Sequence, residues 1–316
     1  MAGEIDVVQT LATTVAAGTP VLYATLGEIL TERSGVLNLG LEGMMLVGGM
    51  AGFAATAVTG NVFIGVLVSL AAGAALALIH AFFACSIGVN QVVSGLSLTL
   101  VGTGIAAYFG RSLVGQPAAD SFQTIKIPVL SDLPVVGPIL FSQNLFVYFS
   151  FLLVPALYFF IYRTRPGLNL RAVGENPATA DAQGISVVGT RYLYTMLGGA
   201  LVGMGGASIS LGSNPNWQEN ITAGRGWIAV GLVIFALWNP WRALVGAYLF
   251  GGLEALQFSL QVAGVPISSY FLRMLPYLLT IAALVFTQWR LKDQAGRASS
   301  AAPSGLGLFY LRRERG

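Results

Sequence analysis

The sequence predicts an all-α, polytopic integral membrane protein with about nine or ten transmembrane helices. Hydrophobic residues make up 55% of the 316 residues, charged residues make up only 9%, and the mean hydropathy is +0.74. A soluble domain carries about 25% charged residues, so its surface could not be built from this composition. Apolar stretches of roughly 18 residues or more recur along the chain, and each is long enough to cross a bilayer as a helix.

The individual spans follow from these apolar stretches. We expect membrane-crossing helices near residues 7–27, 36–58, 62–86, 89–110, 143–162, 192–212, 226–239, 242–262 and 270–289. The 40 glycines suit this class of protein, because small residues let membrane helices approach closely. Gly48 and Gly52, like Gly199 and Gly203, have the spacing of a helix-packing motif, although a glycine-rich chain also produces such spacings by chance.

Four charged residues, Glu28, Glu32, Arg33 and Glu42, interrupt the apolar sequence around the end of the first span. Irregular backbone at membrane depth survives only where it is buried in protein or lines a cavity. If the chain contains a half-span or re-entrant piece, residues 28–42 are therefore the best place for it. The charged groups either line a path for a polar solute, or form an ion pair of Arg33 with Glu28 or Glu32 that fixes a broken helix.

The basic residues predict which ends of the spans face the cytoplasm. Most of the Lys and Arg residues lie in the segment 163–191 and in the tail from residue 290, so both should be cytoplasmic. The segment 111–143 and the loop 213–224 then face the other side, where Trp217 and Trp227 would be interfacial aromatics. Five spans precede the segment 163–191, which places the amino terminus outside unless a half-span reverses it. No basic residue precedes the first apolar run, so we expect no cleaved signal peptide.

Several kinds of chemistry are excluded by what the sequence lacks. It contains no Gly-x-x-x-x-Gly-Lys-Ser/Thr motif, so the chain has no phosphate-binding loop of its own. The single histidine, His80, cannot form a multi-histidine metal site, and the single cysteine, Cys85, lies in an apolar run. We therefore expect no enzyme, no metal site and no cofactor bound by this chain. The basic residues lie between or after the spans, which indicates membrane topology rather than nucleic-acid binding.

Polar residues in or beside the spans are the candidates for a translocation path. Such groups are costly inside a bilayer and are usually functional or paired. The path candidates are Asn38, Glu42, Asn90, Gln91 and Ser94. The alternative for each is that it only hydrogen-bonds neighbouring helices together. For His80 we favour a hydrogen-bonded packing residue, and for Arg225, Glu254 and Arg273 we favour structural pairing.

The basic segment 163–191 carries the signals of a short helix. Asn176 is a favourable N-cap residue, Pro177 is tolerated in the first helical turn, and Gly184 can end the helix. The residues alone permit two interpretations. The helix is either a knob that docks in a groove of a soluble partner, or part of an ordinary basic loop whose arginines only set the topology.

Two stretches resemble a known protein family. Residues 27–45 read GEILTERSGVLNLGLEGMM and are similar to the amino-terminal signature of permeases in the branched-chain amino acid and ribose importer family. Their form most resembles the nucleoside (simple sugar) branch, which is paired with basic-membrane-protein-type binding lipoproteins. The second stretch resembles that family's coupling loop and contains Arg171, Gly174, Glu175, Asn176, Pro177, Ala180, Gly184 and Ile185. Supporting matches lie at residues 221–229, 238–240 and 306–312, so the resemblance covers nearly the whole chain.

The resemblance implies an importer permease fold with a cytoplasmic coupling helix. It implies a multi-pass subunit of an ATP-binding-cassette (ABC) importer in the bacterial cytoplasmic (inner) membrane, surrounded by membrane lipid. The expected partners are an ABC ATPase subunit that binds the ATP, a second permease subunit that is a different chain, and an extracytoplasmic solute-binding protein. The expected cargo is nucleosides, with simple sugars as the second choice.

On this interpretation, residues 1–289 form the transmembrane permease domain and residues 290–316 form a cytoplasmic tail. The domain includes the coupling loop, about 163–191, and the extracytoplasmic segment, about 111–143. One alternative is an ion-coupled secondary transporter of a polar solute, which needs an acidic residue near the bilayer midplane, and Glu42 and Glu254 are its candidates. A third reading, an intramembrane enzyme, lacks a nucleophile–base pair or a metal constellation.

Overall fold

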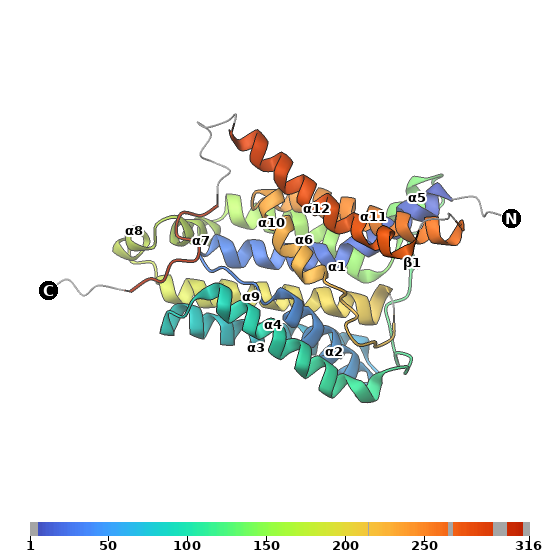
Figure 1. Ribbon diagram of the computed structural model, residues 1–316, viewed down its shortest axis with the longest axis horizontal. Helices are drawn as coiled ribbons and strands as arrows, with labels where there is room; N and C mark the ends of the chain where they lie inside the picture. Colours follow the sequence, from blue (N-terminus) through green and yellow to red (C-terminus); the bar gives the residue numbers. More distant parts are fainter. Residues whose placement is uncertain (1–5, 214, 265–267, 293–301, 312–316) are drawn as a thin grey trace.

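The computed structural model describes residues 6–213, 215–264, 268–292 and 302–311, and these form an elongated bundle of helices (Figure 1). The long helices are α1 (Val7–Arg33), α2 (Leu41–Thr59), α3 (Val62–Ala81), α4 (Gln91–Gly110), α6 (Leu145–Arg163), α9 (Val187–Ser208), α11 (Pro240–Val262) and α12 (Ser269–Lys292). The shorter helices are α5 (Val136–Leu140), α7 (Arg165–Glu175), α8 (Pro177–Ala182) and α10 (Arg225–Ala236).

Several helices are extended or connected by irregular elements. The π-helical turns η1 (Phe82–Ile87) and η3 (Ile209–Ser213) continue α3 and α9, and the 3₁₀ turn η2 (Arg111–Leu113) follows α4. Two short antiparallel strands, β1 (Ile125–Lys126) and β2 (Ser142–Gln143), pair with Ile125 opposite Gln143 and Lys126 opposite Ser142. The all-α prediction is therefore confirmed, with this two-stranded sheet as the one sheet in the described part of the chain.

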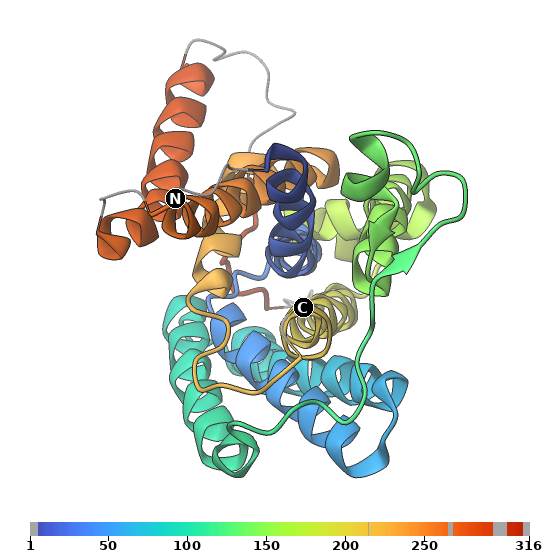
Figure 2. The ribbon, with the colours of Figure 1, turned by 90° about the vertical axis from the view of Figure 1, so that its right-hand side faces the viewer.

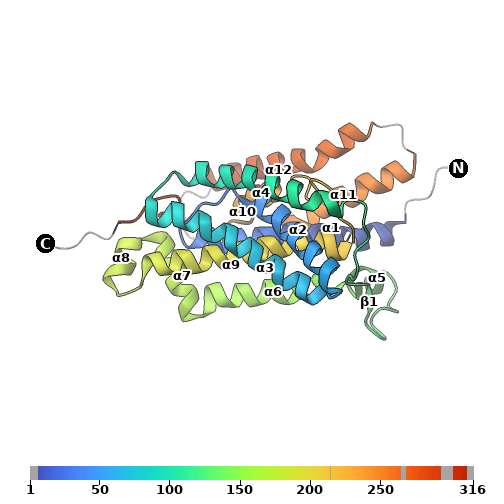
Figure 3. The same ribbon diagram turned by 90° about the horizontal axis from the view of Figure 1, so that it is seen from below.

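The two ends of the bundle carry different segments. Figure 3 shows α7, α8 and residues 302–311 at one end, and α5, β1 and the amino-terminal end of α1 at the other. The side chain of Gln143 donates to the carbonyl of Ala12 over 3.1 Å, which fixes the start of α1 beside the segment 111–143. The segments predicted to lie on the same side of the membrane thus lie at the same end of the bundle, and the side that faces the cytoplasm stays a prediction.

The centre of the bundle is made by α1, α2 and α9. From Gly18 to Arg33 every residue of α1 is buried, and α1 packs against α9 and α11. Figure 2 shows α1 and α9 near the middle of the end-on view, with α12 on the periphery. Because the buried face of α1 includes charged residues, the centre of the bundle holds polar groups that must find partners inside the protein.

Glycines let the central helices approach closely. A Cβ atom added at Gly48 of α2 would overlap the backbone of Gly203 of α9. One added at Gly199 of α9 would overlap Ala77 of α3, and one added at Gly52 would lie 3.0 Å from the carbonyl oxygen of Gly65. Both glycine pairs noted in the sequence are therefore real packing positions, since any larger residue would push these helices apart.

The predicted span at 226–239 is wrong. Its helix, α10, has only 12 residues, so it is about 18 Å long and too short for a hydrocarbon core of about 30 Å. It begins after Gly224, which has a φ of 83°, and ends at Ala236, before Leu237 and Trp238, whose φ values are 51° and 54°. These left-handed positions stop the helix although the apolar sequence continues.

The other predicted spans correspond to long helices with shifted ends. Seven helices of the described residues are long and apolar enough to cross a membrane, and α12, with 24 residues, occupies the place of the last predicted span. The first helix continues to Arg33 instead of ending near residue 27, and the second begins at Leu41 instead of residue 36. The non-helical residues 34–40 between them are called the break below.

Candidate functional site

The backbone N–H groups of the break are held by side chains of two helices and of the break itself. The amide of Asn38 donates to Oε1 of Glu28 over 3.0 Å, and the amide of Leu37 donates to Oε1 of Gln91 over 2.7 Å. The amide of Gly40 donates to Oδ1 of Asn38 over 2.8 Å. Irregular backbone is tolerated at this depth because each of these N–H groups has a partner inside the protein.

The carbonyl groups of the break are held in the same way. The Nε2 atom of His80 lies 3.0 Å from the carbonyl oxygen of Leu37, and its Nδ1 atom lies 3.0 Å from Oγ of Ser94. The hydroxyl of Thr99 donates to the carbonyl of Leu39 over 3.0 Å. His80 is fully buried. It is therefore the hydrogen-bonded packing residue expected from the sequence, and it fixes the break to α3 and α4.

The start of α10 depends on one carboxylate. Oε1 of Glu42 accepts hydrogen bonds from the hydroxyl of Thr222 over 2.5 Å and from the amide of Gly224 over 2.9 Å. Its Oε2 atom accepts from the amide of Gly226 over 2.7 Å. A carboxylate at a helix amino terminus satisfies N–H groups that have no partner in the helix and is favoured by the helix dipole. Glu42, itself 5% exposed, thus joins the first turn of α2 to the first turn of α10.

Glu32 and Arg33 bind the turn between α10 and α11. The indole Nε1 of Trp238 donates to Oε2 of Glu32 over 2.5 Å. The guanidinium of Arg33 donates to the hydroxyl of Tyr162 over 3.1 Å and lies over the ring of that tyrosine. Within the described part of the chain, Arg33 does not form the expected ion pair with Glu28 or Glu32, because its guanidinium points away from α1 toward α6.

A second charged cluster lies at the start of α10. Arg225 forms an ion pair with Glu254 of α11, and this is the one ion pair found among the described residues. The Nη1 atom of Arg225 also donates to the carbonyls of Ile221 and Thr222, at 3.3 and 3.2 Å. The hydroxyl of Tyr277 donates to the carbonyl of Ala223 over 3.0 Å. Structural pairing of Arg225 and Glu254 agrees with the sequence prediction, and nothing is described for the side chain of Arg273.

The structure brings together four of the five path candidates. Asn38, Gln91 and Ser94 surround the break, and Glu42 lies at the start of the following helix. The side chain of Asn90 is exposed instead and caps α4 by accepting from the amide of Val93 over 3.2 Å. In this conformation the four buried candidates hydrogen-bond protein groups, so their role in translocation stays a prediction.

The coupling-loop candidates form two short helices in sequence. Thr164 caps α7 through the amide of Gly167, and Asn176 caps α8 through the amide of Thr179 at 3.0 Å. The helix α8 begins with Pro177 and ends at Ala182, and Gly184 follows with a φ of 83°. The short capped helix expected from the sequence is thus confirmed, but it is preceded by a second helix, α7, that was not expected.

The coupling-loop residues divide between an inner and an outer face. Gly174 and Ala180 are buried, and a Cβ atom at Gly174 would overlap the carbonyl of Arg33. Arg171 is half-buried with its guanidinium over the Tyr162 ring. On the outer face the exposed residues are Glu175, Asn176, Ala178, Thr179, Ala182, Gln183 and Gly184, and Ile185 is half-buried. The outer face of α8 is therefore small and mostly uncharged.

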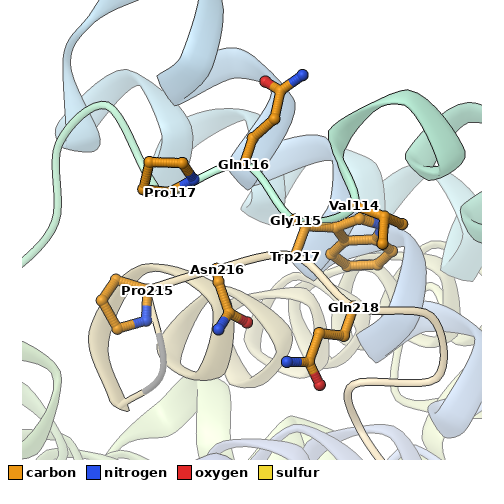
Figure 4. A pocket seen from close by; sticks show the side chains of 8 residues that line it. All are labelled: Val114, Gly115, Gln116, Pro117, Pro215, Asn216, Trp217 and Gln218. Atoms are coloured by element: carbon orange, nitrogen blue, oxygen red, sulfur yellow. The ribbon is translucent and has the colours of Figure 1, made fainter.

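A hollow of about 670 Å³ lies at the opposite end of the bundle. Figure 4 shows two loop segments running side by side along it, with the ring of Trp217 next to Val114. Pro117 and Asn216 form a β-bridge between these segments. Trp217 is fully buried against Gly110, so it is not the interfacial aromatic expected from the sequence. No path candidate lines the hollow, and within the described chain no group of three or more His, Cys, Asp or Glu residues could hold a metal ion.

Sequence reasoning missed the partners that complete these networks. Thr222, Trp238 and Tyr162 bind the buried charges, yet they are 180, 206 and 129 residues away from Glu42, Glu32 and Arg33 respectively. No local spacing could indicate such pairs. The only signal was the presence of charged residues in apolar sequence, which requires that partners exist without saying where.

A family model described as branched-chain amino acid transport system, permease component, matches residues 10–284. A protein of Haloferax volcanii, provisionally named as a glucose ABC transporter permease, is 44% identical and covers 95% of this chain and 96% of its own length. A guanosine ABC transporter permease of Bacillus subtilis is 34% identical, covering 98% of this chain and all of its own. A nucleoside ABC transporter permease of Lactococcus lactis is 32% identical, covering 93% and 94%.

One solved structure has a similar fold. It is an inward-facing conformation of an ABC transporter provisionally assigned to the metal-chelate type, with a TM-score of 0.51 and 16% sequence identity. The similarity covers 89% of this chain and 85% of the other. At this identity the likeness concerns the arrangement of helices.

Proposed function

The chain belongs to the family of permease components of branched-chain amino acid transport systems, and we propose that it carries nucleosides across the membrane and couples to its ATPase through α7 and α8. It is the membrane-spanning permease subunit of an ABC importer, not an enzyme, and it is a multi-pass protein of the cytoplasmic membrane. As such it works with an ATPase and an extracytoplasmic binding protein.

The coupling proposal is carried by one observation: one face of the coupling loop is packed on the bundle and the other is exposed. Its inner face is fixed to the bundle by Gly174 against the end of α1 and by a buried cluster of Val173, Ala180 and Val187. Its outer face is the exposed side of the six-residue helix α8, where Ala178, Thr179 and Ala182 carry no charge. A short helix that is packed firmly on the bundle and exposes a small surface can fit into a groove of a soluble partner. ATP is bound and hydrolysed by that partner.

The coupling proposal is tested at Gly184. No atom lies within 4 Å of a Cβ placed there, so Gly184→Val would not clash. However, the left-handed φ of 83° disfavours a β-branched residue and should displace the end of α8. We expect the ATPase to be lost from complexes purified through a tag on this chain. Thr179→Val, on the exposed face of the same helix, is the control for loss of a polar group without strain. Normal assembly and uptake with Gly184→Val would refute the assignment.

The nucleoside proposal is supported by the signature at residues 27–45 and by the guanosine and nucleoside permeases among the relatives. A simple sugar is the second candidate, because the relative with 44% identity bears the name of a glucose permease. The two are separated by deleting the gene and measuring uptake of labelled guanosine, uridine, glucose and ribose. Loss of nucleoside uptake supports the first candidate. Loss of sugar uptake with unchanged nucleoside uptake assigns the chain to the second.

We further propose that the second permease subunit is a different chain and that the coupling loop faces the cytoplasm. In a Cys85→Ala background, a cysteine at the exposed Thr179 should resist membrane-impermeant thiol reagents in intact cells. A cysteine at the exposed Gln116, at the opposite end, should react. The reverse pattern would overturn the orientation. Purification through one tag, followed by mass spectrometry, shows whether a second permease sequence co-purifies.

A further inference from the structure

Residues 302–311, called the strap below, fold back onto the coupling loop at the end of the bundle where α8 lies (Figure 1). The amide of Gly305 donates to the carbonyl of Gly174 over 2.8 Å. Both the amide and the hydroxyl of Ser304 donate to Oε2 of Glu175, at 3.2 and 3.1 Å. The sequence predicted only a cytoplasmic tail here, so the attachment of the strap is a finding of the structure.

The far end of the strap is attached to the same loop. The hydroxyl of Tyr310 donates to Oδ2 of Asp181 over 3.1 Å, and its ring packs on the buried cluster beneath α8. Glu175 and Asp181, the two acidic residues of the coupling loop, are therefore both engaged by the strap. The strap and the loop share contacts at both ends of α8.

The middle of the strap is attached to the break instead. The amide of Gly307 donates to the carbonyl of Gly35 over 3.1 Å. The side chain of Arg191, from α9, donates through Nη1 to the carbonyl of Leu308 over 2.8 Å and through Nε to the carbonyl of Ser34 over 3.3 Å. One guanidinium thus joins the strap, the break and α9.

Arg191 is a buried cation whose described partners are carbonyl groups. It is 1% exposed, and no carboxylate of the described residues lies within ion-pair distance. Ser34 is the C-cap residue of α1, and the carboxyl end of a helix carries a partial negative charge that favours a cation. The planar guanidinium of Arg191 can donate to two acceptors at once, whereas a lysine presents one compact ammonium group.

The junction of the three elements is closely packed. A Cβ atom at Gly305 would lie 2.7 Å from the carbonyl oxygen of Gly174, and one at Gly35 would lie 2.9 Å from Nη2 of Arg191. Gly174 in turn contacts the carbonyl of Arg33 closely. Because closely packed elements transmit displacement instead of absorbing it, a movement of α7 and α8 at this junction would displace the break.

We propose that Arg191 and the strap are positioning elements that carry the movement of the coupling loop to the break. This proposal rests on the proposed docking of the ATPase to α7 and α8. The break holds Asn38 and leads directly into Glu42, so its displacement alters the packing of the buried path candidates and of the start of α10. The strap is on this view a transmitting part of the permease, while α8 is the part that the ATPase contacts.

Substitution of Arg191 is the direct test, made in the full complex with its ATPase and partner permease. In Arg191→Lys we expect the ATPase to remain bound and ATP hydrolysis to stay within about twofold of wild type, while uptake of labelled guanosine and glucose falls at least tenfold. Arg242→Lys, the same exchange at an exposed position in the first turn of α11, is the matched control and should keep wild-type uptake. Unchanged uptake in Arg191→Lys would overturn the proposal.

Two further variants test the proposal if Arg191→Lys does not fold. One is a chain truncated after residue 302, and the other is Gly305→Ala. Both should give the same separation of hydrolysis from uptake. Loss of ATPase binding in parallel with loss of uptake would show that the strap is a docking surface and would overturn the transmitting role. A failure of the docking proposal gives a different result. In that case the Gly184→Val complex would retain its ATPase, independently of the results for the strap variants.

Cross-linking tests whether the strap and the coupling loop move together. Cysteines at Ser304 and Glu175, in the Cys85→Ala background, can be joined by a short bismaleimide. If strap and loop move as one body, the cross-linked complex should keep its uptake of guanosine or glucose. Abolished uptake after cross-linking, with normal uptake before it, would mean that the two must separate during transport, and the proposal would fail.

Discussion

The break and the loop leading into α10 are both non-helical backbone buried among helices, but their polar groups are satisfied in different ways. The break is held by side chains distributed over α1, α3 and α4, and each of them serves one backbone group. The start of α10 is held by a single carboxylate, Glu42, which accepts from three donors. The distributed arrangement should tolerate single losses, whereas the concentrated one should not.

The largest effect is therefore expected for Glu42→Ala. It leaves the hydroxyl of Thr222 and the amides of Gly224 and Gly226 without their acceptor. At about 1 kcal/mol or more for each unsatisfied buried group, the free energy of unfolding should fall by at least about 3 kcal/mol. Thermal unfolding in detergent measures this. Thr222→Val removes one donor only and should cost about a third as much. Equal losses for the two variants would show that Glu42 does not hold α10 in this way.

The next largest loss of stability is expected at two glycines, one packed against Glu42 and one packed against the break. A Cβ at Gly226 would lie 2.5 Å from the Cα of Glu42, and one at Gly95 would lie 2.6 Å from the amide nitrogen of Leu39. Since backbone cannot move aside easily, we expect Gly226→Ala and Gly95→Ala each to destabilise the protein by about 1–3 kcal/mol.

The control is Gly104→Ala, because no atom lies within 4 Å of a Cβ at this exposed position in α4. Alanine is favoured over glycine in a helix by roughly 0.5–1 kcal/mol, so this variant should be slightly more stable than the parent. A Gly226→Ala protein as stable as Gly104→Ala would contradict the close approach of α2 and α10.

A smaller effect is expected when one support of the break is removed. Gln91→Ala leaves the amide of Leu37 without its acceptor and should cost about 1–3 kcal/mol. Thr99→Val removes the bond to the carbonyl of Leu39 and should cost about 1 kcal/mol. The double variant, measured by the same unfolding assay, tests whether the supports act together. If the double variant lost much more stability than the two single variants together, the supports of the break would act cooperatively.

The smallest effect is expected for Asn90→Ala. Asn90 is exposed and only caps α4, and loss of such a cap costs typically about 1 kcal/mol or less in an exposed helix. Uptake of guanosine and glucose should be unchanged, since the exposed side chain of Asn90 binds the amide of Val93 in its own helix. A transport defect without a loss of stability would return Asn90 to the translocation path, where the sequence placed it.

The sequence by itself determined the features that depend on residues close together in the chain. Composition predicted the membrane class, and all but one of the spans predicted from apolar runs correspond to long helices. Asn176, Pro177 and Gly184 predicted the short helix α8, because a capping side chain and its helix lie within a few residues of each other. The motif at residues 27–45 indicated the family to which the chain belongs.

The tertiary structure alone decided which distant groups meet. The length of α10, the burial of Trp217 and the attachment of the strap all depend on partners far away in the sequence. Glu42 illustrates the reason: its charge required partners at membrane depth, but Thr222, 180 residues away, could be found only once the helices were packed. Arg191 is the other case, since its basic character suggested topology and its burial against α1 and the strap gives it a different role.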